Sequence, residues 1–83
     1  MASMAFIPEG VCSTRIVIQT DGDRICQVLF EGGCDGNLQG ICRLAEGRTI
    51  AEVAALLKGI DCDGKGTSCP DQLARALERI EAG

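Results

Sequence analysis

The chain has 83 residues, a formal net charge of −4 at pH 7, six cysteines and no histidine. This length predicts one domain with a small core. The acidic charge and the lack of basic runs argue against nucleic acid as a partner, and the apolar stretches are too short to span a membrane. Without histidine, Ser-His-Asp and Cys-His nucleophiles and mixed Cys/His zinc sites are excluded. A metal site would have to be built from thiolates, with or without a carboxylate.

The N-terminal residues contain no positive segment followed by an apolar run, so they do not resemble a secretory signal. Together with Met1 at the start, this predicts a cytoplasmic protein, although a mature secreted chain that has lost its signal is the alternative. Thiols are kept reduced in the cytoplasm, and clustered cysteines there more often bind metal or carry out redox chemistry than form structural disulfides. We expect a single domain over residues 1–83, with a leader at residues 1–8 and a folded core at residues 9–81.

A β-hairpin is predicted from residues 14–20 and 24–30. Both segments are rich in β-branched residues, and a short run of Asp and Gly between them is a turn signal. Alternation along the second strand places Cys26 on the same face as Val28. Cys26 is therefore expected to be a small buried residue.

Two helices are predicted after a glycine-rich loop at residues 31–37. Apolar residues recur at helical spacing over residues 38–45 and predict the first helix, with Gly47 as its end. Thr49 and Glu52 have the spacing of a capping box, in which the hydroxyl accepts from the N–H three residues later. This pair predicts the start of the second helix.

The last helix is predicted over residues 70–81, because Pro70 is favoured in the first turn of a helix. Leu73 and Leu77 lie on its apolar face, and Gln72 is expected on the exposed side. The order of elements predicts an α+β fold. It consists of a small antiparallel β-sheet, made of the hairpin and an optional N-terminal strand, covered on one face by about three short helices.

Four of the cysteines lie at the boundaries of the predicted elements, and they are the candidate metal ligands: Cys12, Cys34, Cys62 and Cys69. In a hairpin the start of the first strand lies beside the end of the second, so Cys12 and Cys34 can be neighbours. Glycines near the cysteines leave backbone N–H groups free to donate to sulfur. The other two cysteines, Cys26 and Cys42, fall inside regular elements at core-facing positions and are predicted to be buried.

Four thiolates would close a tetrahedral shell around zinc, and such a site contributes an apparent ~10–16 kcal/mol in small zinc peptides. This exceeds the roughly 3–5 kcal/mol expected from a core of this size, so the metal would decide whether the domain folds. Reactive dithiol chemistry, disulfides and inert thiols remain alternatives. Nearby acidic residues are expected to be solvated turn residues, with a carboxylate ligand as the alternative: Glu31, Asp35, Asp61 and Asp63.

The run Thr67-Ser68-Cys69-Pro70-Asp71 resembles the signature of the TSCPD domain family, which takes its name from those five letters. The family includes small stand-alone proteins with four characteristic cysteines, and related domains lie at the C-termini of some ribonucleotide reductases. The resemblance covers residues 9–80. It implies a metal-binding module, with zinc as cofactor and an accessory or regulatory role related to ribonucleotide reductase. That reductase or another protein would be the partner, and no independent catalytic role is expected. The matching cysteines are Cys12, Cys34, Cys62 and Cys69.

A weaker likeness relates Cys12, Cys34 and Cys69 to the cysteines of iron–sulfur cluster scaffolds of the IscU/NifU type, and it implies a similar fold. The scaffolds carry an Asp two residues after the first cysteine, where this chain has Thr14, and they have no counterpart of Cys62. Both departures predict a site that holds its metal. The alternative function is therefore a thiol-redox protein or an iron–sulfur cluster scaffold or carrier, with iron or an iron–sulfur cluster as the cofactor.

Overall fold

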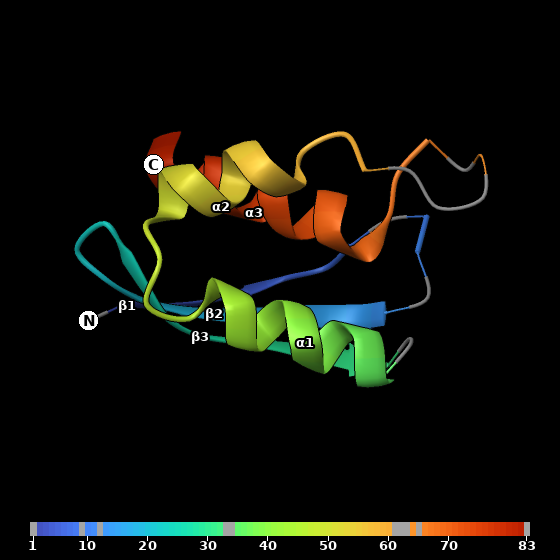
Figure 1. Cartoon of the computed structure of the whole chain (residues 1–83), viewed down its shortest axis with the longest axis horizontal. Coiled ribbons are helices and arrows are strands. Elements are labelled where there is room, and N and C mark those ends of the chain that lie inside the picture. The colour runs from blue at the N-terminus through green and yellow to red at the C-terminus, as the bar shows by residue number, and fades with distance from the viewer. Residues whose placement is uncertain are drawn as a thin grey trace.

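The computed structural model describes residues 2–8, 10–11, 13–32, 35–60, 64 and 66–82. The strands form one antiparallel sheet in the order β1-β2-β3, and the helices pack against it (Figure 1). The predicted α+β fold class is confirmed. The elements are β1 (Ala2–Phe6), β2 (Ser13–Asp21), β3 (Arg24–Gly32), α1 (Asp35–Ala45), α2 (Ile50–Leu57) and α3 (Cys69–Ala82).

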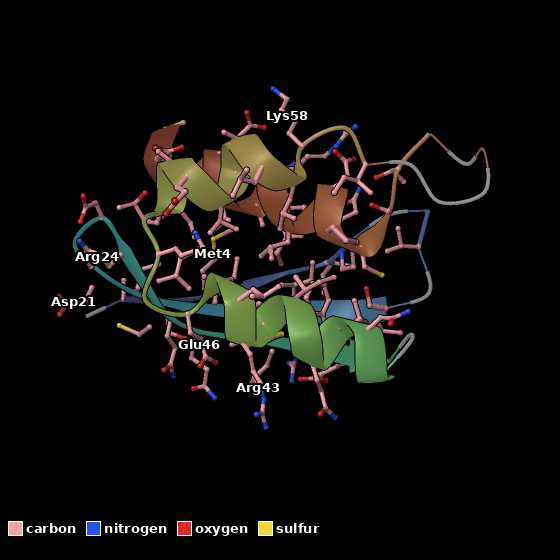
Figure 2. The ribbon with its side chains drawn as sticks, viewed as in Figure 1. Met4, Asp21, Arg24, Arg43, Glu46 and Lys58 are labelled. Atoms are coloured by element: carbon pink, nitrogen blue, oxygen red, sulfur yellow. The ribbon has the colours of Figure 1, made fainter. Side chains whose placement is uncertain are left out.

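Strand β1 lies at one edge of the sheet. Residues 2–6, which the sequence assigns to a leader, pair with β2 along their whole length. Met4 points between the sheet and the helices (Figure 2) and packs against the core, in which Phe6 is buried. The guanidinium carbon of Arg79 on α3 lies 5.0 Å from the centre of the Phe6 ring, within the range of a cation–π contact. The N-terminal segment is thereby attached to both layers of the fold.

The pairing of β2 with β3 changes register near Cys26. Thr20 pairs with Ile25. The preceding residue of β2, Gln19, pairs with Gln27, which leaves Cys26 opposite no residue of β2. One extra residue in a strand reverses the alternation of its faces. Ile25 is therefore buried and Cys26 is exposed, so the prediction that Cys26 is buried is wrong.

The connection between α1 and α2 follows the predicted signals. Gly47 comes two residues after the end of α1 and has a φ of +85°, which a residue with a Cβ adopts only at a cost. Thr49 caps α2, and its hydroxyl accepts from the Glu52 N–H at 3.2 Å. The carboxylate of Glu52 forms an ion pair with Arg48 at 3.2 Å. The start of α2 was thus correctly predicted.

One hydrophobic cluster joins the three helices to the inner face of the sheet. Ile16 and Ile18 of β2 and Leu73 and Leu77 of α3 have no exposed surface. The polar side chains of Arg43 on α1 and of Glu46 just after it point away from this core (Figure 2). None of the described helices is long and apolar enough to cross a membrane. The cluster comprises Phe6, Ile16, Ile18, Ile25, Val28, Cys42, Ala45, Ile50, Val53, Ala54, Leu73, Ala76 and Leu77.

The bulge leads to a stability prediction. Ile25→Ala should lower the free energy of unfolding by about 2–5 kcal/mol, because it removes a fully buried side chain. Cys26→Ala should change it by no more than about 0.5 kcal/mol, because the thiol lies in solvent. Chemical denaturation of the two variants, at matched metal content, measures both effects. A larger loss for Cys26→Ala than for Ile25→Ala would contradict the bulge.

Candidate functional site

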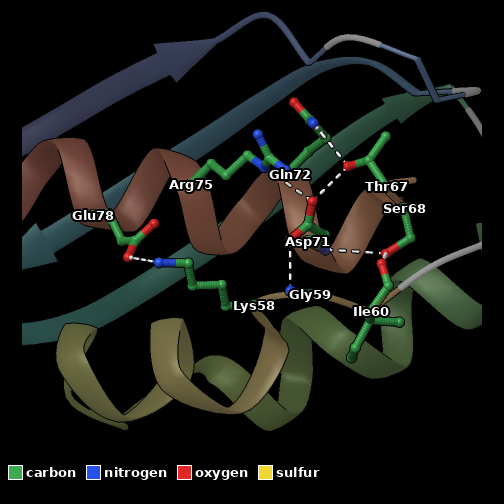
Figure 3. A network of polar contacts seen from close by, with 9 residues as sticks. All are labelled: Lys58, Gly59, Ile60, Thr67, Ser68, Asp71, Gln72, Arg75 and Glu78. Atoms are coloured by element: carbon green, nitrogen blue, oxygen red, sulfur yellow. Dashed lines mark hydrogen bonds and ion pairs between the residues drawn. The ribbon is translucent and has the colours of Figure 1, made fainter. Parts of the chain in front are cut away.

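Ser68 fixes the start of α3, where the candidate site lies. Its carbonyl accepts from the Gln72 N–H at 2.8 Å and its hydroxyl accepts from the Asp71 N–H at 3.1 Å, the bonds of an N-cap residue. The same hydroxyl donates to the carbonyl of Ile60 at 2.6 Å (Figure 3). The residue that begins the helix is therefore also bonded to the chain that leaves α2.

The carboxylate of Asp71 is the centre of a second set of bonds at this end of α3 (Figure 3). The side chain is only 1% exposed. Its Oδ1 accepts from the Gly59 N–H at 2.7 Å, and its Oδ2 accepts from the Thr67 hydroxyl at 2.6 Å and from Nε of Arg75 at 2.9 Å. The Gln72 amide in turn donates to the Thr67 hydroxyl at 2.9 Å. These bonds join the end of α2 to the residues just before α3.

The charge state of Asp71 follows from these contacts. Burial acts to raise the pKa of Asp71, but the hydrogen bonds from Thr67, Gly59 and Arg75, together with the positive charge of Arg75, lower the pKa below its ordinary value. The carboxyl is therefore ionised at neutral pH. Both of its oxygens are occupied by donors, so its role here is to hold the backbone.

Cys69 is the predicted ligand that the structure describes. It begins α3 and is 8% exposed, and its Sγ lies 3.1 Å from Oγ of Ser13, which is 4% exposed. These residues are 56 positions apart in the chain. Ser13 directly follows Cys12, and it pairs across the sheet with Gly32, which comes two residues before Cys34. Ser13, the neighbour of Cys12, therefore contacts Cys69. Gly32, two residues before Cys34, is paired with Ser13.

The remaining predicted ligands, Cys12, Cys34 and Cys62, lie outside the described residues. Within the part of the chain that the structure describes, no group of three or more His, Cys, Asp or Glu side chains is placed to hold a metal ion. The four-cysteine site thus stays a prediction. Cys42 is buried in the core, as predicted, and burial and the nearby charge of Glu46 raise the pKa of its thiol.

Of the four acidic residues near the cysteines, Glu31 is the one whose side chain the structure describes. It lies at the end of β3, is exposed, and forms an ion pair with Arg15 of the neighbouring strand. Its carboxylate is therefore a surface group, as expected, although it belongs to a strand and not to the loop. Nothing is described of the side chains of the other three: Asp35, Asp61 and Asp63.

Three residues of the site were not identified from the sequence. Gln72 was expected on the exposed side of the helix but is only 6% exposed. Its side-chain amide turns inward and donates to the Thr67 hydroxyl. Asp71 could have been found, since a Ser followed three residues later by an acidic residue before an apolar run is a helix-start signal. Ser13 gave no such signal, because its partner is distant in the chain.

Comparison with known proteins adds one finding. A family model described as the TSCPD domain matches residues 1–81. The match includes β1 as well as α3, and so covers all of the described elements but the last residue of α3. No curated protein and no solved structure gave a match.

The Asp71 network leads to a second prediction. Asp71→Asn should lower the free energy of unfolding by about 1.5–3 kcal/mol, because it removes a buried charged acceptor from three donors. Glu78→Gln is the matched control. That carboxylate also bonds from α3 to the end of α2, at 3.0 Å from Nζ of Lys58, but both groups are partly exposed. Its loss should cost no more than about 1 kcal/mol. Both unfolding free energies are measured by denaturation. If the two variants lose equal amounts, the buried carboxylate of Asp71 stabilises the fold no more than the partly exposed one of Glu78.

Proposed function

The chain belongs to the TSCPD domain family, and we propose that it is a small zinc-binding domain. The observation that supports this most directly is the contact between Ser13 and Cys69, which joins the start of β2 to the start of α3. Zinc would be held by the four thiolates that the sequence analysis identifies: Cys12, Cys34, Cys62 and Cys69.

The contacts of the described residues favour a common location for the four sulfurs. Consecutive Cα atoms are about 3.8 Å apart, so a residue stays near its neighbour in the chain. Cys12 is one residue from the hydroxyl that contacts the Cys69 sulfur. Cys34 is two residues from Gly32, which pairs with Ser13.

Cys62 is tied to the same place through its own neighbours. It comes two residues after Ile60, whose carbonyl accepts from the hydroxyl of Ser68, the residue before Cys69. The connection that contains Cys62 is also held at its two ends by Asp71, through Gly59 and Thr67. Each of the three undescribed cysteines is thus within two residues of a group bonded to the start of α3 or to Ser13.

The donor chemistry fits zinc. Thiolates are preferred zinc ligands, and four of them leave no open position on the metal, which is typical of structural sites. Bound zinc would supply a cross-link between distant parts of the chain. The protein's own residues contribute the positions: Ser68 and Asp71 fix the start of the helix that carries Cys69, and the sheet fixes Ser13 beside it.

The contacts of Thr14 count against the alternative of a cluster scaffold. Thr14 occupies the position at which the scaffold family has an Asp. Its side chain is exposed, and its hydroxyl donates to the carbonyl of Glu31 at 3.1 Å, whereas Ser13 is buried beside Cys69. Position 14 therefore supplies no carboxylate of the kind that helps cluster release in the scaffold family. The family resemblance further leads us to propose an accessory role beside a ribonucleotide reductase or another protein, in the reducing cytoplasm.

Metal analysis tests the proposal. Protein purified without added metal should contain one zinc ion per chain, by elemental analysis and native mass spectrometry, and a strong chelator should unfold it. Cys69→Ser and Cys34→Ser should each abolish zinc binding and folding, because zinc contributes an apparent ~10–16 kcal/mol in small zinc peptides.

Two cysteines outside the proposed site serve as controls. Cys26→Ser should keep both zinc and stability, since its thiol is exposed. Cys42→Ala should keep zinc and lose only about 1 kcal/mol of unfolding free energy. A chain that lacks stoichiometric metal and is fully folded in chelator would refute the zinc site. Equal effects at all six cysteines would contradict the assignment of four ligands and two other cysteines. Absorbance near 400 nm after anaerobic purification would favour an iron–sulfur cluster instead.

A further inference from the structure

We propose that Ser13 is a positioning residue that donates its hydroxyl hydrogen to the sulfur of Cys69 and thereby strengthens metal binding. The inference rests on the proposed function and extends it to a residue that is not itself a ligand. The distance between Oγ of Ser13 and Sγ of Cys69 is 3.1 Å, and both side chains are buried.

The direction of the hydrogen bond follows from the chemistry of a ligand thiolate. In the metal-free thiol form either atom could be the donor. A metal-bound cysteine has lost its proton, because the thiolate is the form that coordinates metal. The serine hydroxyl is then the partner that still carries a hydrogen. The bond becomes a charge-assisted one, stronger than its neutral counterpart.

The adjacent residue shows that this placement is specific to one face of the strand. Ser13 and Thr14 are consecutive hydroxyl residues at the start of β2. Thr14 is exposed and donates to the Glu31 carbonyl, and Ser13 is buried against α3. Thr14 therefore supplies a control with the same functional group, one residue away, that does not contact Cys69.

A donor to a metal-bound sulfur acts in two ways. It holds the cysteine side chain in one orientation, and it withdraws charge from the thiolate. Partners of this kind behind a ligand typically contribute 10–100-fold in metal affinity. Because the backbone of Ser13 is paired with Gly32, the sheet holds the Ser13 hydroxyl in position beside α3.

Cobalt(II), used as a spectroscopic substitute for zinc, tests the inference. The full chain and the variants Ser13→Ala, Ser13→Thr and Thr14→Val are loaded with cobalt, and the metal is removed by competition with a chelator. We expect Ser13→Ala to bind about 10–100-fold more weakly. Its sulfur-to-cobalt charge-transfer band should move to longer wavelength, because an unbonded thiolate gives up charge more easily. Ser13→Thr should restore both values, and Thr14→Val should match the unmodified chain.

The other outcomes separate this inference from the proposed function. If the unmodified chain takes up cobalt with a thiolate spectrum and Ser13→Ala is indistinguishable from it, the role of Ser13 is overturned and the metal site stands. Equal weakening in Ser13→Ala and Thr14→Val, or no recovery in Ser13→Thr, would make residue 13 a packing position and overturn the inference. If the unmodified chain binds neither cobalt nor zinc, the proposed function fails and this inference fails with it.

Discussion

The buried carboxylate of Asp71 holds the start of α3 against the end of α2, and the geometry of the candidate site depends on that contact. Burying an ion is unfavourable unless hydrogen-bond donors replace the water it loses. Here the donors are Gly59, Thr67 and Arg75, at 2.6 to 2.9 Å. Since Gly59 follows α2 and Thr67 precedes α3, one charge holds both ends of the connection that contains Cys62. The ion is thus used to close a turn of the chain, a task that an apolar side chain in its place would not perform.

The site draws on three places that are far apart in the chain. Ser13 starts one strand, Gly32 ends the next, and Cys69 begins the last helix. The core holds these places together before any metal is considered, because β2 and α3 share buried side chains such as Ile16 and Leu73. A metal ion would then cross-link places that the core already directs toward one another, and its binding would supply free energy that so small a core lacks.

Most of the fold could be predicted from local signals in the sequence. The predictions failed where contacts between distant parts of the chain determine the structure. The Thr49 cap and the apolar spacing along the helices depend on neighbours within a few residues, and both were found in the structure. The bulge at Cys26 depends on cross-strand pairing, which alternation in one strand does not reveal. For the site, Cys69 was placed correctly at the start of α3, whereas Ser13 was missed because its contact spans the chain.

The five residues that give the family its name have separate duties in this molecule. Asp71 bonds to Thr67 and to Ser68, and Ser68 also bonds to Ile60, which lies just after α2. Cys69 alone faces Ser13. The hydroxyl and carboxylate groups of the motif therefore shape the backbone, and that backbone presents the sulfur of Cys69 to the start of β2.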